Sequence, residues 1–253
     1  MTPRQRLLVF LAGAAGLAAL LAWGVAGLPG FGDHRSAYGQ LVTRSSVPLR
    51  NATDVVTVVN LDVRGLDTIG EEFILFCSVT AAAVLLRRQA RERVGAARDE
   101  FPGRRAPGRD DAVLVLGTAM GALVVCFGLY VVGHGQLTPG GGFQGGGILA
   151  GGVALLYLAS GVRTLERMAP EWLLEVGEAV GAGAFVLIGL ASLAAGAAFL
   201  QDLLPLGSSG TITAGGTLGL INAAIGLEVA AGISLVVSLF LVQLARIEEA
   251  DRP

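Results

Sequence analysis

Long apolar stretches separated by short polar blocks make up most of the chain, and their lengths predict helices that cross a membrane. A crossing needs about 20 predominantly apolar residues in helical conformation. Six stretches reach or approach that length, and each is bounded by charged residues, proline or glycine. We therefore expect six transmembrane helices, at 7–28, about 65–86, 112–133, 143–162, 172–200 and 216–244.

The second predicted helix is unusual because its charge-free part is too short to cross a bilayer. Only 14 residues separate Glu72 from Arg87, whereas a crossing needs about 20. The helix must therefore include Glu71 and Glu72, which places at least one carboxylate at or below the lipid headgroups. Such a group is costly unless it is neutral, paired or hydrated. We expect Asp67 or Thr68 to cap the start of this helix.

The longest charge-free run, 112–162, has 51 residues, which is enough for two crossings and a short turn. Pro139 and the three glycines from Gly140 to Gly142 are the natural position for that turn, because proline lacks a backbone donor and glycine accepts any φ. A glycine-rich loop can also bind phosphate, but the Lys-Ser/Thr pair of a P-loop and a preceding strand are missing here. We therefore interpret this segment as a tight turn between helices.

Small residues recur along the fourth predicted helix. Gly151 follows Gly147 by about one helical turn and Gly152 comes one position later, and each glycine inside a helix costs about 1 kcal/mol. Small residues at this spacing let helices approach closely in lipid. We expect this face to pack against another helix or subunit, with Phe143 anchoring the start of the helix.

A few polar side chains lie within or beside the predicted helices. His134 is the only side chain in the charge-free run that titrates near neutral pH, and we expect it to hydrogen-bond within the turn rather than relay protons. Glu228 is the only charged residue in the interval 203–243, so it should lie well within the sixth helix. Glu175 and Glu178 share one face near the start of the fifth helix.

The composition supports a membrane protein. Hydrophobic residues fill 53% of the 253 positions and charged residues only 15%, and the charges are confined to short blocks. The net charge of -2 gives no electrostatic footprint for nucleic acid. Cys77 and Cys126 lie in separate apolar stretches, so packed free thiols are expected rather than a disulfide or metal site. The predicted fold class is all-α, a polytopic membrane protein.

The arginines predict the domain organisation and the orientation. Residues 87–111 hold eight arginines and five acidic residues. Contact with anionic lipid or RNA is one interpretation, but a cytoplasmic loop that obeys the positive-inside rule is simpler. With both termini cytoplasmic, inside segments hold 14 arginines and outside segments four. The turn after His134 is then external, and the external loop 29–66 should contain a short interfacial or re-entrant piece.

The central turn carries a motif, Gly133-His-Gly-Gln-Leu-Thr-Pro-Gly-Gly-Gly-Phe-Gln-Gly-Gly-Gly147. It resembles the signature of the MnhB (MrpB) family, a small membrane subunit of multisubunit cation/proton antiporters. The later segment from Gly210 to Gly232 is similar to that family's closing helix, so the resemblance covers about residues 110–246. It marks a structural signature loop made of His134, Pro139, Gly140, Gly141, Gly142, Phe143 and Gln144.

A second motif, Asn60-Leu-Asp-Val-Arg-Gly-Leu-Asp-Thr-Ile-Gly-Glu71, resembles the C-terminal end of the large MnhA (MrpA) subunit and the small MbhE subunit of membrane-bound hydrogenases. The chain therefore resembles a fusion of an MbhE-like unit at 1–88 with an MnhB-like unit at 112–253, joined by the linker 89–111. The family has one Glu after the Gly, whereas this chain has two. Which of Glu71 and Glu72 faces the pathway is left open, although the position in the motif favours Glu71.

The resemblance implies an accessory subunit of a sodium/proton antiporter in a prokaryotic cell membrane, beside MrpA-, MrpC-, MrpD-, MrpF- and MrpG-like partners. It implies no cofactor and no covalent chemistry, and the sequence offers no nucleophile–base pair and no metal cluster. A transient Na⁺ near Glu71 is compatible with the oxygen ligands that hard cations prefer. The ion-pathway candidates are Glu71, Glu72, Asp67, Thr68 and Glu228.

Three alternatives stay open. The same chain fits an ion pump driven by a hydrogenase or dehydrogenase, in which other subunits carry the redox groups. It also fits a purely structural scaffold subunit, in which each buried carboxylate is capped or paired. An intramembrane hydrolase would need His134 and an acid on the same side, whereas the predicted topology puts Glu175 and Glu178 near the inner face.

Overall fold

The computed structural model describes residues 3–28, 30, 36–86, 111–160 and 167–250. These residues form helices joined by loops, and six helices are long and apolar enough to span a membrane. The six are α1 (Pro3–Ala26), α4 (Gly65–Leu86), α6 (Asp111–Gly133), α7 (Gly142–Ser160), α9 (Glu171–Ala194) and α10 (Leu218–Ala250). The all-helical class and the six candidate spans are therefore confirmed. The predicted linker 89–111 lies, except for Asp111, outside the described residues.

Contacts divide the chain into two compact units, residues 1–41 and 42–253. The first unit consists of α1 and the beginning of α2 (Ala37–Arg50). Apolar residues are distributed all around α1, and a helix of this kind is suited to contact with lipid on every side. The remainder of α2 belongs to the second unit, where Val42 and Ser46 are buried.

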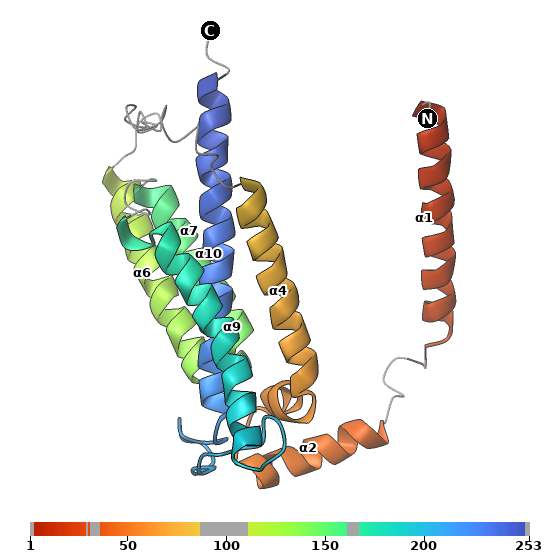
Figure 1. Ribbon diagram of the computed structural model, residues 1–253, viewed down its shortest axis with the longest axis vertical. Coiled ribbons are helices and arrows are strands. Elements are labelled where there is room, and N and C mark those ends of the chain that lie inside the picture. Colours follow the sequence, from red (N-terminus) through yellow and green to blue (C-terminus); the bar gives the residue numbers. More distant parts are fainter. Residues whose placement is uncertain (1–2, 29, 31–35, 87–110, 161–166, 251–253) are drawn as a thin grey trace. The chain divides into compact units, whose positions relative to one another are not determined.

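The second unit is a bundle built around α10 (Figure 1). α10 packs against α4, α6, α7 and α9, while α6 also pairs with α7. The core of the bundle contains Phe185 from α9 and Leu218, Ile221 and Val229 from α10, all at most 2% exposed. The central position of α10 therefore makes it the most buried of the candidate spans.

Glycines let α7 pack tightly against both of its neighbours. A methyl group added at Gly146 would lie 2.7 Å from Cβ of Val229 on α10, and one added at Gly152 would lie 2.8 Å from Val125 on α6. Gly147 and Gly151 have no such neighbour within 4 Å, so the expectation that they pack against another helix is wrong for the helices described here. Adjacent residues differ by about 100° around a helix, and the contact faces therefore lie one position away.

The two cysteines are free thiols on exposed positions of α4 and α6. The expectation that Cys77 and Cys126 are packed inside the protein is therefore wrong for this chain. The outer face of a transmembrane helix is as apolar as its packed face, so hydrophobicity alone does not show which face a residue occupies.

The segment between α2 and α4 is a folded part of the bundle. It contains one turn of α-helix, α3 (Val55–Val58), and a π-helical turn, η1 (Val59–Val63). Asp54 caps α3 by accepting a hydrogen bond from the N–H of Val56 at 3.1 Å. Val58 and Leu61 are buried in the core. A short piece was predicted in this loop, whereas the longer helix α2 was not.

The fifth and sixth helices are shorter at one end than predicted. The fifth was expected to reach Leu200 but ends at Ala194, and the sixth begins at Leu218 rather than Gly216. Gly196 and Gly216 have positive φ values of 78° and 60°. Glycine readily adopts this conformation, which a regular helix does not contain, so α9 ends before Gly196 and α10 begins after Gly216.

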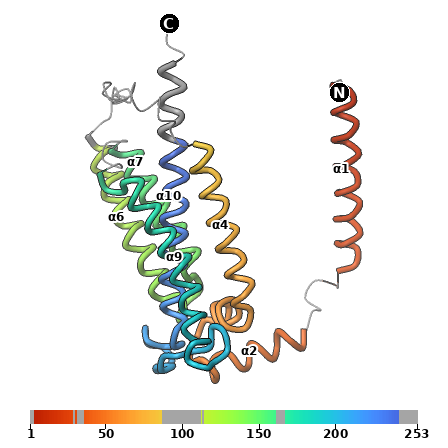
Figure 2. Tube along the Cα trace, viewed as in Figure 1, coloured from red at the N-terminus to blue at the C-terminus, as the bar shows by residue number. Residues whose placement is uncertain are grey.

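One end of the bundle gathers three loop segments and is termed the loop end (Figure 2). These segments are 51–64, 134–142 and 195–217. Arg50 joins two of them, because its guanidinium lies 2.7 Å from Asp62 and 3.5 Å from Asp202. The hydrogen bond that Arg50 donates to Asp62, reinforced by the negative charges of Asp62 and Asp202, raises the pKa of Arg50 above its usual value. The arginine therefore remains charged at this position.

Candidate functional site

The glycine-rich turn between α6 and α7 is compact, as predicted. Gly140 and Gly141 have φ values of 146° and 116°, which favour glycine. Nδ1 of His134 donates a hydrogen bond to the Tyr130 carbonyl at 3.0 Å, and the two rings stack with centroids 4.0 Å apart. The carbonyl of His134 accepts a hydrogen bond from the N–H of Leu137 at 2.8 Å. His134 thus hydrogen-bonds within the turn.

Asn222 on α10 holds the start of α7. Its Oδ1 accepts a hydrogen bond from the N–H of Gly142 at 2.8 Å, and its Nδ2 donates to the Leu218 carbonyl at 3.1 Å. Phe143 is 47% exposed, so the expectation that it anchors this helix is wrong. The buried bond between Gly142 and Asn222 supplies the anchor, and Phe143 is left to line a cavity.

The segment that precedes η1 is hydrogen-bonded to the turn. The hydroxyls of Thr53 and Thr57 donate to the carbonyls of Leu137 and Gly135, each at 2.6 Å. Between them, the N–H of Asp54 donates to the carbonyl of Gln136 at 3.2 Å. Three successive carbonyls of the turn are therefore bound by one short segment, which fixes the two parts of the chain against each other.

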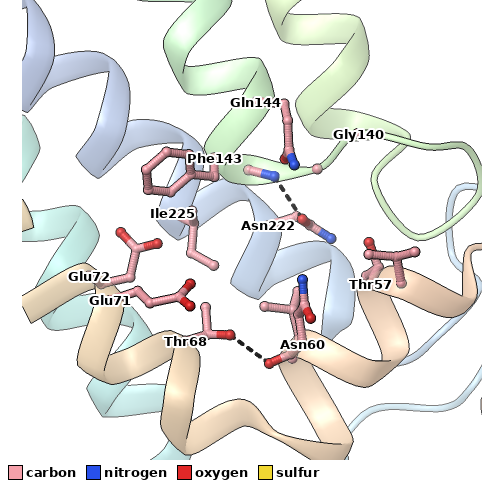
Figure 3. A pocket seen from close by; sticks show the side chains of 14 residues that line it. Thr57, Asn60, Thr68, Glu71, Glu72, Gly140, Phe143, Gln144, Asn222 and Ile225 are labelled. Carbon is pink, nitrogen blue, oxygen red and sulfur yellow. Dashed lines mark hydrogen bonds between the residues drawn. The ribbon is translucent and has the colours of Figure 1, made fainter. Parts of the chain in front are cut away.

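A polar cavity of about 220 Å³ lies at the loop end, between η1, the start of α4, the glycine turn and α10 (Figure 3). Phe143 and Ile225 form part of its apolar wall. Its polar lining includes the side chains of Thr57, Asn60, Thr68, Glu71, Glu72, Gln144 and Asn222. The cavity therefore places two carboxyl groups beside amide and hydroxyl groups in an otherwise apolar bundle.

The candidates at the start of α4 differ in position. Thr68 and Glu71 line the cavity, and the Thr68 hydroxyl donates to the Asn60 carbonyl at 2.7 Å. Asp67 is not part of the lining and accepts a hydrogen bond from Nε of Arg64 at 2.7 Å. Because α4 begins at Gly65, Asp67 and Thr68 lie inside its first turn, and the expectation that one of them caps the helix is wrong.

Three glutamates from three helices are buried in the bundle. Glu72 on α4, Glu178 on α9 and Glu228 on α10 are 3%, 4% and 0% exposed, and they are termed the glutamate triad. The carboxyl groups of Glu72 and Glu178 both lie within electrostatic range of Glu228. Among the described residues, both oxygens of Glu72 and Glu228 and Oε1 of Glu178 have no hydrogen-bond partner.

Two glycines explain why these acids come together. A methyl group added at Gly181 on α9 would lie 2.5 Å from the backbone nitrogen of Glu228. One added at Gly232 on α10 would lie 3.5 Å from Oε1 of Glu178. The small residues therefore let α9 and α10 approach until each glutamate lies against the backbone of the opposite helix.

Sequence reasoning found the acids but not their grouping. Glu228 was expected to lie well within the sixth helix, and Glu178 was assigned to the inner face together with Glu175. In the structure Glu178 is grouped with Glu228, whereas Glu175 is exposed. Of the adjacent pair on α4, Glu72 is buried in the bundle and also lines the cavity, while Glu71 is exposed and lines the cavity only. Glu72 thus connects the cavity to the triad.

Comparison with known proteins identifies one domain. Residues 113–235 match the family described as a domain related to the MnhB subunit of Na⁺/H⁺ antiporter. The matched residues include the glycine turn, Glu178, Asn222 and Glu228. The chain is also 28% identical over 219 residues to an uncharacterized protein of Methanocaldococcus jannaschii, covering 78% of this chain and 80% of that protein.

Two solved structures contain a similar chain. One is the membrane-bound sulfane sulfur reductase (MBS), an archaeal respiratory membrane complex, with a TM-score of 0.73 and 29% identity over 94% of this chain and 98% of that chain. The other is the Mrp complex from Dietzia sp. DQ12-45-1b, with a TM-score of 0.69 and 26% identity over 94% of this chain. This chain spans only 26% of that longer chain. It is therefore a multi-pass membrane subunit that carries an MnhB-related domain and resembles subunits of the Mrp and MBS complexes.

Proposed function

We propose that this chain is a membrane subunit of a multisubunit Mrp-type cation (Na⁺)/proton antiporter, in which it helps to form the ion path and the packing between subunits. The observation that carries the proposal is the cavity at the loop end, which holds Glu71 and Glu72 between the start of α4 and the MnhB-related turn. Carboxyl groups within a membrane span are costly and usually mark ion or proton pathways. The match of residues 113–235 to the MnhB-related domain supports the same assignment.

Glu71 is the residue to which the proposal assigns transient contact with the cation. Its side chain is exposed and lines the cavity near Thr68 and Asn60. Hard cations prefer carboxylate, carbonyl and hydroxyl oxygens of this kind. Asp67 takes no part in this contact, since it pairs with Arg64 outside the cavity lining. Glu72, which shares the cavity, is the route by which protons would enter the bundle.

The proposal also divides the chain into an MbhE-like unit at 1–88, the linker 89–111 and an MnhB-like unit at 112–253. The similarity to the Mrp complex supports this division, because 94% of this chain matches 26% of one longer chain there. The matched part of this chain extends over both proposed units. The partners would be MrpA-, MrpC-, MrpD-, MrpF- and MrpG-like proteins in a prokaryotic cell membrane, with both termini of this chain cytoplasmic.

The chain is not expected to transport ions alone. The cavity lies at one end of the bundle, and within the described residues the polar groups do not form a continuous path to the other end. The purified chain in lipid vesicles should show no cation-driven proton flux. Flux at the rate of the whole complex would contradict this part of the proposal.

The test of the proposed function is sodium-driven proton flux in vesicles that contain the assembled complex. Glu71→Gln keeps the shape of the side chain and removes its charge, and it should slow exchange at least about tenfold, the effect of a barrier raised by ~1.4 kcal/mol. Glu175→Gln, at an exposed acid on α9, is the matched control and should leave exchange unchanged. The assignment would be refuted if complexes with Glu71→Gln and complexes with Glu72→Gln both assembled and both exchanged ions at the wild-type rate.

The second candidate is a subunit of a redox-linked ion pump, which the similarity to the MBS complex over 98% of that chain favours. A purely structural scaffold is the third. Subunits that copurify in mild detergent separate the first two, because a redox complex requires iron–sulfur subunits and an antiporter does not. A scaffold would tolerate neutral replacements of Glu71 and Glu72 without loss of ion movement in either complex.

A further inference from the structure

The glutamate triad extends beyond the cavity and is not needed for cation contact at Glu71. We propose that Glu72, Glu228 and Glu178 form a proton relay that leads from the cavity into the middle of the membrane. The relay rests on the proposed function, because the cavity would be its entrance. The relay is inferred, however, from the burial and spacing of three carboxyl groups rather than from the cavity itself.

The three carboxyl groups are staggered along the bundle. α4 and α10 begin at the loop end and α9 ends there. With a rise of about 1.5 Å per residue, Glu72 lies about 10 Å from the start of α4 and Glu228 about 15 Å from the start of α10. Glu178 lies about 24 Å from the end of α9 on the same basis. Its contact with Gly232, one helical turn beyond Glu228, gives the same order.

This stagger carries the triad through the centre of a bilayer. The hydrocarbon core is about 30 Å thick, and the carboxyl groups occupy levels from about 10 to about 24 Å along the bundle. Glu72 lines the cavity, and Glu228 interacts with both of the other acids. The groups therefore form a sequence of neighbours, Glu72, Glu228 and Glu178, with one end open to the cavity.

Among the described residues, the charged groups that interact with the triad are all acidic. Glu72 faces Glu228 and has Glu71 as its neighbour, whereas Glu178 faces Glu228 and has Glu175 as its neighbour. Residues 65–86 of α4, 171–194 of α9 and 218–240 of α10 contain no basic residue, and α6 and α7 contain no charged residue from 112 to 160. Like charges in a buried site cannot all be retained without a compensating cation. Protons shared among the three carboxyl groups supply that compensation.

The surroundings favour protons over a bound metal cation. Gly181 packs against Glu228, and the void that Glu72 and Phe185 line together measures only about 10 Å³. That volume is at the lower limit for a single water molecule. Metal cations with oxygen ligands usually take about six of them around one centre. The staggered carboxyl groups cannot enclose a single ion in this way, whereas each can bind one proton.

The proton steps conserve charge. Protonated Glu72 gives its proton to the carboxylate of Glu228, which leaves Glu72 ionised and Glu228 neutral. Glu228 then gives the proton to the carboxylate of Glu178 and returns to the ionised form. Glu72 is protonated again from water in the cavity. Glu72 and Glu228 are thus each an acceptor in one step and a donor in the next, and Glu178 holds the proton at the end of the relay away from the cavity.

Infrared spectroscopy of the purified complex tests whether the triad holds protons. A protonated carboxylic acid has a carbonyl stretching band that a carboxylate lacks, and this band should weaken in Glu228→Gln and in Glu72→Gln at neutral pH. Glu171→Gln, which removes an exposed acid from the start of α9, should leave it unchanged. An identical band in the wild type and in both triad variants would overturn the proposal.

Proton flux in vesicles with the same complexes tests whether the triad moves protons. Glu228→Gln and Glu178→Gln should slow flux by about 100-fold, the lower part of the range for a positioned proton-transfer group. Glu228→Asp keeps a titratable group and should recover part of the rate, which a merely structural role would not produce. Wild-type flux in an assembled Glu228→Gln complex would overturn the relay.

The two measurements also separate this inference from the proposed function. If the wild type shows sodium-driven exchange and the Glu228→Gln complex is equally active, the relay is refuted and the antiporter assignment stands. Absence of sodium-driven exchange in the wild type would remove the antiporter assignment. In that case, proton flux driven by the redox partner would be measured with the same variants, and a loss in Glu228→Gln beside a normal Glu171→Gln would support the relay.

Discussion

The loop end and the centre of the bundle treat polar groups in opposite ways. At the loop end, Asn222, Thr57 and Thr68 each have a hydrogen-bond partner at 2.6 to 2.8 Å. In the centre, Glu72 and Glu228 have none among the described residues. A buried polar group without a partner costs several kcal/mol. The first arrangement therefore stabilises the fold, whereas the second is retained at the expense of stability.

This difference separates what substitutions should do in the two regions. Removal of a hydrogen-bonded group at the loop end leaves its partner unsatisfied and lowers stability. Replacement of an unpartnered acid in the centre removes a desolvation penalty and leaves nothing unsatisfied. The following predictions test this comparison, by thermal unfolding of the purified complex in detergent.

Asn222→Ala should have the largest effect. It removes the acceptor for the N–H of Gly142 and the donor to Leu218, so the buried N–H at the start of α7 is left without a partner. Such a change costs about 3 kcal/mol, and the complex should unfold at a clearly lower temperature. An unchanged unfolding temperature would show that the bond to Asn222 does not anchor the turn.

Gly146→Ala should be the next most harmful change, because the added methyl group would lie 2.7 Å from Val229. Overpacking of this kind costs about 2 kcal/mol. Gly147→Ala is the matched control one position along α7, where no atom lies within 4 Å. It should leave the unfolding temperature unchanged or raise it. Equal destabilisation by both substitutions would contradict the assignment of the packed face.

Glu178→Leu should act in the opposite direction. It replaces a buried acid, of which one oxygen has no partner among the described residues, by an apolar side chain of similar size. Removal of such a buried charge raises stability by about 1.5 kcal/mol. If this variant is instead strongly destabilised, Glu178 makes a structural bond in the assembled complex and the contrast between the two regions fails.

Arg50→Ala should have the smallest effect, although it removes the ion pairs of Arg50 with Asp62 and with Asp202. All three side chains retain some exposure to solvent, and pairs of this kind contribute about 1 kcal/mol or less. The raised pKa of Arg50 means that it is charged both folded and unfolded in the neutral range, so the loss should not vary with pH there. A large change between neutral and mildly alkaline pH would contradict this account.

The fold could be predicted from sequence where length alone decides the outcome. The 14 residues after Glu72 could not cross a bilayer, so α4 had to include the acidic pair, and Pro139 with its glycines marked the turn. The face that each residue occupies could not be predicted, because lipid and protein interior are both apolar. For this reason Cys77 was misplaced, and the face by which α7 packs on α6 and α10 was expected one position away from where it lies.

The triad was missed for a related reason. Its members come from α4, α9 and α10, and each appears in the sequence as an isolated acid in an apolar stretch. Their meeting depends on the close approach of α9 and α10 at Gly181 and Gly232. Gly177 and Gly181 lie about one helical turn apart, and Glu178 follows Gly177. This spacing could have indicated a packed face that carries an acid.

Glu72 belongs to both regions, since it lines the cavity and interacts with Glu228, and it therefore tests the central claim most directly. The measurement is sodium-driven proton flux in vesicles that contain the assembled complex with Glu72→Gln, beside the unfolding temperature of the same preparation. The account predicts that flux falls by about 100-fold while the unfolding temperature stays the same or rises. Wild-type flux in that complex would contradict the claim that the cavity and the triad form one ion path.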